Sequence, residues 1–115
     1  MGTALWKIKI KSGKEDLALE WLSFLKENQE EGNQTLKNEK EYLEIYFVNR
    51  ENGTMYIYSY VLADDLDNAS KIALSSKNPL NQKHFEYMKA CVDVEGCIQM
   101  QPELALGDFS VFQSR

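Results

Sequence analysis

The sequence predicts an α+β domain in which helices cover one face of a four-stranded antiparallel sheet. Three observations support this fold class. A short alternating segment opens the chain, a long hairpin lies at its centre, and an amphipathic helical segment follows each of them. A chain of 115 residues has the length of one domain, and we take residues 1–115 as a single unit.

The first strand and the first helix are predicted by their apolar periodicity. Residues 5–11 alternate, with Trp6, Ile8 and Ile10 on one side and three lysines on the other. Ser12 and Glu15 have the spacing of a capping box, so a helix is expected over residues 14–29. Its apolar stripe comprises Leu17, Ala18, Trp21, Leu22, Phe24 and Leu25. Residues 26–41 are polar and predict a connection with at most a short turn at 35–39.

Residues 42–62 read as one hairpin. Asn52-Gly53 supplies the two positive φ angles of a type I′ turn, and this turn sets Phe47 opposite Tyr58 and Glu44 opposite Val61. Both faces of the hairpin are rich in apolar and aromatic side chains. A sheet of this kind needs a cover on each side. We expect helices to provide one cover and a second copy of the chain to provide the other.

The second half of the chain repeats the order of helix and strand. Asp64 or Asp65 is expected to cap a helix that residues 75–78 interrupt, and Pro79 then begins a second helical piece that extends to about Val92. Residues 97–106 are predicted to form the fourth strand, in which Pro102 indicates an edge position or a bulge. Residues 109–115 are expected to form strand or loop.

The resulting order is β-α-β-β-α-β with the second helix broken in two. This is the split, ferredoxin-like plan, in which strands one and three are central. For the orientation of the sheet, we expect the helices to cover Trp6, Ile8 and Ile10 together with Leu43, Ile45 and Phe47. The other face would then carry Lys7, Lys9, Glu44 and Ser59.

Composition and charge exclude several classes of protein. A net charge of −5 argues against a nucleic-acid-binding domain. No run of about 18 apolar residues is present, and the first residues lack a signal peptide, so a cytoplasmic protein is expected. Cys91 and Cys97 have no histidine nearby, which predicts two reduced thiols and no zinc site. We expect no metal and no cofactor.

The sequence offers two candidate catalytic residues. His84, the single histidine, would serve as a general base in a pocket or would be solvated on a helix surface. Glu44 in mid-strand would be a desolvated acid with a raised pKa or the partner of Lys7 or Lys9 in an ion pair. Candidate ligand-binding residues are Tyr46, Ser59, Lys9 and Trp21. The tyrosines equally fit cross-strand pairs that stabilise the sheet and its interface.

Four stretches carry a resemblance to a known superfamily. They are Trp21-x-x-Phe24-Leu25, Thr35-Leu36-x-x-Glu39, Asn52-Gly53 and Ser76-x-x-Pro79-x-Asn81-x-x-His84. With the order of elements, they resemble the dimeric α+β barrel superfamily and, within it, a family of small bacterial proteins. The resemblance implies a homodimer whose two sheets pack face to face.

Two functions are expected, the first from the two-faced sheet and the absence of a convincing catalytic set, and the second from the resemblance. The first is a non-catalytic domain that binds a small ligand or acts in regulation. The second is a cofactor-independent, monooxygenase-like enzyme acting on an aromatic small molecule, in which His84, with Glu44 or a tyrosine, moves a proton. The chain lacks the ligand histidine and the Asn/Trp set of the haem-degrading members, so haem is not expected.

Overall fold

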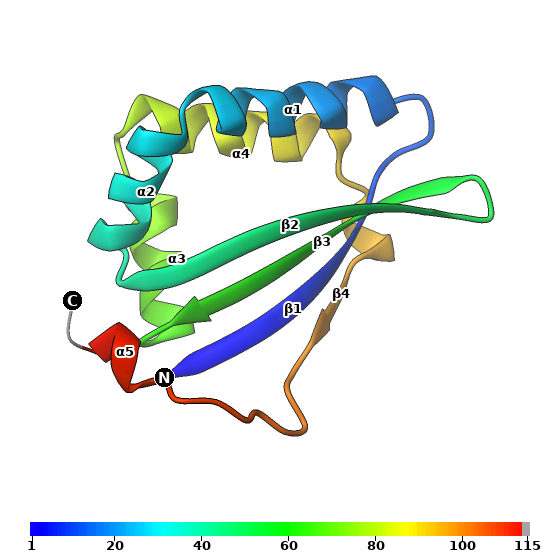
Figure 1. Ribbon diagram of the computed structural model, residues 1–115. Helices are drawn as coiled ribbons and strands as arrows, with labels where there is room; N and C mark the ends of the chain where they lie inside the picture. The colour runs from blue at the N-terminus through cyan, green and yellow to red at the C-terminus, as the bar shows by residue number, and fades with distance from the viewer. Residues whose placement is uncertain (114–115) are drawn as a thin grey trace.

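The computed structural model describes residues 1–113, and its four strands form one antiparallel sheet in the order β2-β3-β1-β4. The strands are β1 (Gly2–Lys9), β2 (Glu41–Glu51), β3 (Thr54–Ala63) and β4 (Ile98–Met100). Four helices lie on the same side of this sheet (Figure 1): α1 (Glu15–Glu27), α2 (Gln29–Asn38), α3 (Leu66–Ser75) and α4 (Pro79–Cys91). The predicted α+β class and the central position of β1 and β3 are confirmed.

The hairpin formed by β2 and β3 follows its predicted register. Asn52 and Gly53 have φ angles of 52° and 80°, as a type I′ turn requires. Pairing runs from Glu51 opposite Thr54 back to Leu43 opposite Leu62, and a bulge follows at Glu41/Leu43. A two-residue turn therefore fixes the relative position of the two longest strands.

The predicted orientation of the sheet is wrong. Trp6 in β1 lies opposite Ser59 in β3, and Ser59 in turn lies opposite Tyr46 in β2. Directly opposite residues share a face, so Tyr46 and Ser59 lie with Trp6 beneath the helices. Phe47 lies on the other face and is 56% exposed. The sequence fixes the hairpin register but not the β1–β3 register, and a shift of one residue exchanges the two faces.

The sheet has a helix-covered face and an open face. The helix-covered face carries Ala4, Trp6, Ile8, Glu44, Tyr46, Val48, Ile57, Ser59 and Val61. The open face carries Leu5, Lys7, Lys9, Ile45, Phe47, Tyr56, Tyr58, Tyr60, Ile98 and Met100. The hydrophobic core joins the helix-covered face to α1 and α4, through Ile8, Ile10, Ala18, Trp21, Met55, Ile57, Cys91 and Val92.

The first helical region differs from its prediction. Residues 29–38 form a full helix, α2, rather than a polar connection with one turn. Only Thr35 is buried in α2, so the segment has almost no apolar stripe to reveal it. The predicted capping box is also wrong, because Lys14 occupies the N-cap position of α1 and no side chain caps that end.

The second helical region matches its prediction. Asp65 caps α3, since its carboxylate accepts a hydrogen bond from the Asn68 backbone N–H at 3.2 Å. Asn78 caps α4 by accepting from the Leu80 N–H at 2.8 Å, and Pro79 takes the first helical position. The break between the two helical pieces therefore comes from a separate cap at each start.

The fourth strand is much shorter than predicted. Only Ile98–Met100 pairs with β1, and a short 3-10 helix at Val94–Gly96 precedes it. Pro102 has no N–H to donate to a ladder, and the strand ends before it. Residues 101–109 form an irregular segment, called the C-terminal arm below. The tail predicted as strand or loop begins as the short helix α5 (Ser110–Gln113), while residues 114 and 115 lie outside the described part of the chain.

Replacing Gly53 with Ala should destabilise the protein by about 1 kcal/mol, because Gly53 has a φ of 80° and an alanine there is strained. Urea unfolding followed by circular dichroism measures the change. The control is Gly32→Ala in α2, where an added Cβ would meet only Leu80 Cδ2 at 3.9 Å. This control should stabilise the helix by roughly 0.5–1 kcal/mol. Equal effects of the two substitutions would contradict the assignment of the turn.

Candidate functional site

Three cross-strand neighbours form a row on the helix-covered face. Trp6 and Tyr46 flank the small side chain of Ser59. Trp6 is 38% exposed although it lies on this face, so the helices do not close over it. The Ser59 hydroxyl has no hydrogen-bond partner within residues 1–113, and no fully buried side-chain polar atom there lacks one. Ser59 itself is buried, with only 5% of the residue exposed.

Trp21 of α1 and His84 of α4 lie on the helix side of this row. Trp21 is fully buried, and the centroid of its ring lies 6.0 Å from that of Tyr46 in an edge-on arrangement. The ring centroids of Trp21 and His84 are 5.5 Å apart, and the Trp21 Nε1–H donates a hydrogen bond to His84 Nδ1 at 2.8 Å. Trp21 thus connects the sheet to His84 on α4.

The hydrogen bond from Trp21 fixes the tautomer of His84. An indole N–H can only donate, so Nδ1 is the acceptor and the proton of the neutral ring sits on Nε2. Burial lowers the pKa of His84 to about 4, which keeps the ring neutral at pH 7. The expectation of a solvated histidine is therefore wrong. His84 presents an N–H donor, and its lone pair is already used by Trp21.

Glu44 belongs to a group of three carboxyls at the junction of α2 and β2. It accepts a hydrogen bond from the hydroxyl of Tyr46. Burial raises the pKa of Glu39 to about 7 and that of Glu41 to about 8, and a neighbouring carboxylate adds to each increase. Burial also raises the pKa of Glu44, as expected for a desolvated acid. Asn81 Nδ2 donates to Glu39 Oε1 at 3.4 Å.

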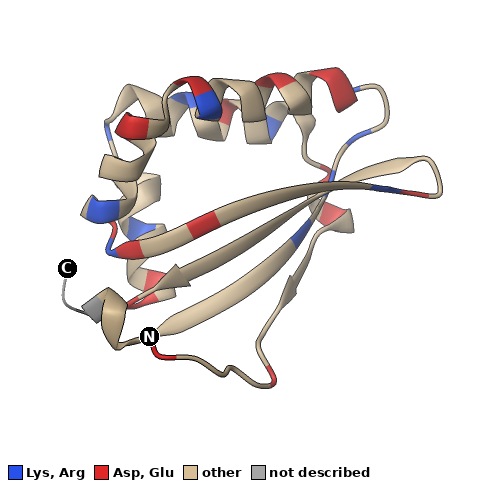
Figure 2. Ribbon diagram, in the orientation of Figure 1, with Lys and Arg blue, Asp and Glu red and all other residues tan. Residues whose placement is uncertain are grey.

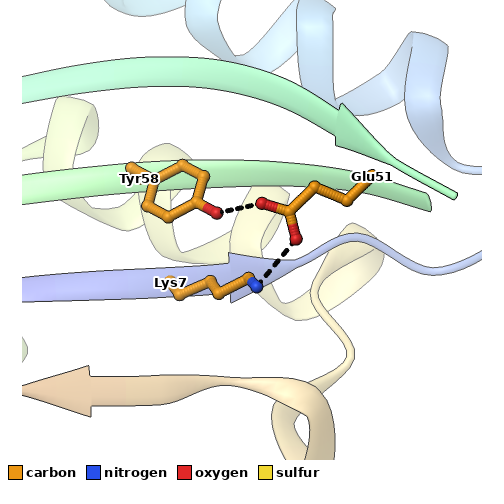
Figure 3. Close-up of polar contacts among 3 residues, drawn as sticks. All are labelled: Lys7, Glu51 and Tyr58. Carbon is orange, nitrogen blue, oxygen red and sulfur yellow. Dashed lines mark hydrogen bonds and ion pairs between the residues drawn. The ribbon is translucent and has the colours of Figure 1, made fainter.

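The two lysines considered as partners of Glu44 lie on the open face, so that alternative is wrong. Lys7 Nζ lies 2.8 Å from Glu51 Oε2, and the Tyr58 hydroxyl donates to the other oxygen of Glu51 at 2.5 Å (Figure 3). Lys9 Nζ lies 3.5 Å from Asp93 Oδ2. The structure therefore brings together Glu44, Tyr46, Ser59, Trp21 and His84, and it separates Lys9 from them.

Sequence reasoning missed four residues around this group: Trp6 as part of the row, Glu39, Glu41 and Asn81. The spacing Glu39-x-Glu41-x-x-Glu44 is the signal that could have indicated the three carboxyls. Within residues 1–113, no group of three or more His, Cys, Asp or Glu side chains is arranged to hold a metal ion. In the same part of the chain, no helix is long and apolar enough to cross a membrane.

A comparison with protein families identifies the family to which this chain belongs. Residues 1–108 match a family described as a family of unknown function, DUF6176. The chain belongs to this family. The match to DUF6176 extends from β1 to the C-terminal arm and includes every side chain of the group described above. A comparison with curated proteins found no match.

The buried carboxyls give a pH dependence of stability that can be tested. In the folded protein, burial raises the pKa of Glu39 to about 7 and that of Glu41 to about 8, well above the ordinary pKa of a glutamate. The folded state therefore keeps protons that the unfolded chain has lost, and the free energy of unfolding should fall as pH rises from 6.5 to 8. His84 contributes only below the ordinary pKa of a histidine, 6.5, because burial lowers its pKa to about 4 and the effect on stability then has the opposite sign.

Glu41→Gln should reduce that fall in the free energy of unfolding by about 1 kcal/mol. One pKa unit corresponds to about 1.4 kcal/mol, and we expect less than the full raised pKa would give because solvent screens a partly exposed carboxyl. Urea unfolding at pH 6.5 and pH 8 measures it. Glu30→Gln on the exposed side of α2 is the control and should keep the wild-type slope. A wild-type slope in Glu41→Gln would show that Glu41 is not desolvated.

Proposed function

We propose that this protein is a homodimeric domain that binds a small aromatic ligand between the sheet and the helices. The row Trp6–Ser59–Tyr46 forms the floor of this site. The observation that carries the proposal is the exposure of Trp6, 38%, which together with the exposure of Val48, 45%, shows that the helices leave part of this face uncovered. Small-molecule sites combine aromatic walls with a few polar groups that fix orientation. Trp6 and Tyr46 supply such walls, and the Ser59 hydroxyl is a free polar group between them.

The polar groups around the row favour a neutral or cationic ligand. His84 offers its Nε2–H, and Ser59 offers a hydroxyl that can donate or accept. The carboxyl of Glu44 lies beside Tyr46, and none of the side chains in this group carries a positive charge. Three neighbouring carboxyls would repel an anion as they ionise.

A cofactor-independent, monooxygenase-like enzyme is the second candidate. It is favoured by the buried Glu44, whose raised pKa suits proton transfer. It requires a base, and His84 cannot accept a proton unless the hydrogen bond from Trp21 breaks. Binding without catalysis therefore fits the geometry better than proton abstraction by His84.

The open face supports the homodimer. It exposes large apolar side chains, among them Ile45 at 41%, Phe47 at 56% and Ile98 at 53%. The lysines of this face are paired within the subunit, Lys7 with Glu51 and Lys9 with Asp93. The whole chain, by contrast, has a net charge of −5. Figure 2 shows that charged residues concentrate on the helices and are absent from β3. A second copy placed on this face would meet no unpaired like charge.

The open face supplies part of the area that a second copy would need. β2 and β3 pair from Leu43 to Glu51, which at about 3.3 Å per residue gives a length of roughly 30 Å, and four strands about 4.8 Å apart give a width of roughly 15 Å where β4 (Ile98–Met100) is present. The flat area of this face is therefore on the order of half the ~800 Å² that each partner gives to a stable interface, and a dimer would also need contacts beyond the sheet. Such a dimer is the assembly of the α+β barrel superfamily that the order of elements resembles.

The ligand site can be tested by intrinsic fluorescence, because both tryptophans of the chain, Trp6 and Trp21, belong to it. We expect 1-naphthylmethylamine and the neutral 1-naphthalenemethanol to change this fluorescence saturably. Above pH 8, where Glu39 and Glu41 are ionised, the anion 1-naphthoate should bind at least about tenfold more weakly than the amine, because these carboxylates repel it. Ser59→Leu fills the space between Trp6 and Tyr46 and should weaken binding of the amine by at least about tenfold.

Leu74→Ala is the control for this titration, since Leu74 is 72% exposed on α3. Its affinity for the amine should equal that of the wild type. If none of the three naphthalene probes saturates, or if Ser59→Leu binds like the wild type, the proposed site is wrong.

The homodimer can be tested by sedimentation at micromolar concentration. The wild type should sediment as a dimer, and Phe47→Asp should sediment as a monomer, because it places a charge in the apolar part of the open face. Leu74→Asp adds the same charge on the helix side and should remain dimeric. A wild type that is monomeric at this concentration contradicts the assembly.

A further inference from the structure

Among the described residues, the two most exposed leucines lie in the C-terminal arm. Leu104 is 75% exposed and Leu106 is 85% exposed. Single exposed apolar residues are common and need no explanation. Here the two leucines stand two residues apart in a segment whose charged members are Glu103 and Asp108, so they form an apolar strip with few charges (Figure 2).

The arm is held at both of its ends. β4 precedes it and pairs with β1 at one edge of the sheet, from Met100 opposite Leu5 to Ile98 opposite Lys7. After the arm, the ring of Phe112 in α5 lies 5.6 Å from the ring of Tyr42, at the start of the strand on the other edge. The arm therefore crosses the sheet from edge to edge near the start of β1 (Figure 1).

The apolar strip of the arm continues the apolar surface of the open face. Ile98 and Met100 point to that face, are 53% and 36% exposed, and are followed along the chain by Leu104 and Leu106. A partner that covers the open face would therefore lie against β4 and reach Leu104 with Glu103 as the single charged residue between Met100 and Leu104.

We propose that the arm of each subunit packs Leu104 and Leu106 on the open face of the partner subunit, so that two arms clasp the dimer. This inference rests on the proposed homodimer. The two leucines are matched by the exposed Ile45 and Phe47 of the partner subunit. The interface then includes the arm in addition to the two sheets.

The test measures the dimer dissociation constant of the full chain by sedimentation over a concentration series. The double variant Leu104→Ser/Leu106→Ser should raise this constant by roughly 10- to 100-fold, because two apolar side chains lose their burial. Circular dichroism should show an unchanged fold, since both leucines are exposed in the single subunit. Leu74→Ser, at a similarly exposed leucine on α3, is the matched control and should leave the constant unchanged.

A photo-cross-linking experiment identifies what the arm contacts. A benzoylphenylalanine in place of Leu106 should give a covalent dimer on irradiation, with the cross-link mapping to residues 43–49 of the partner subunit. A photoreactive group in place of Leu74 should not. Cross-links confined to one chain, or an unchanged dissociation constant in the double variant of a dimeric protein, overturn the clasp and leave the homodimer intact. A monomeric wild type overturns both.

Discussion

The pairing of Trp6 with Ser59 is the constraint on which the arrangement of this protein depends. The hairpin turn fixes β2 against β3, and this single register then assigns every side chain of the three long strands to a face. The pairing of β1 with β3 is stabilised near both of its ends. Ile8 and Ile57 lie opposite each other in the core, and Thr3 Oγ1 donates to the Val61 carbonyl at 2.8 Å. A shift of one residue would bury Lys7 beneath the helices and expose Trp6 and Ile8.

The hydrogen bond between Trp21 and His84 shows how the helix layer keeps a polar group inside an apolar core. A charged imidazole would be expensive to bury, so the lowered pKa of His84 and its neutral ring follow from its place on α4. The indole N–H in turn needs an acceptor because Trp21 is fully buried. Each group satisfies the other, and the edge of Trp21 packs on Tyr46. The position of the sheet floor and that of His84 are therefore linked through one side chain.

The sequence could predict those elements whose signal is local. Asn52-Gly53 identifies its turn because few residues adopt two positive φ angles, and Pro79 marks a helix start because it lacks an N–H. The helix α2 could not be predicted, since it buries only Thr35 and has no apolar stripe. The face assigned to Phe47 was wrong for a different reason. Which face of β1 joins which face of β3 depends on a long-range pairing that no local pattern encodes.

The candidate site was predictable only where its residues are related by a local signal. Glu44, Tyr46 and Ser59 belong to the hairpin, so their common face followed from its turn, and their grouping held. Lys9 depended on the β1 register and was assigned to the wrong group. His84 and Trp21 are on different helices, and only tertiary packing brings them together. The burial of Glu39 and Glu41 could not be predicted, because a carboxyl in a polar stretch is normally solvated and only the folded chain encloses these two.

The alternation of side chains along β2 and β3 links the two proposed roles of the sheet. Tyr46 belongs to the helix-covered face that we propose as the ligand floor, while its neighbours Ile45 and Phe47 point to the proposed dimer interface. Ser59 points to the floor, and Tyr58 and Tyr60 point to the interface. The two proposed roles use different side chains, although these side chains belong to the same two strands. Covering the open face would hold the strands that position Ser59 and Tyr46, so a second copy can order the floor of the site without contributing any residue to it.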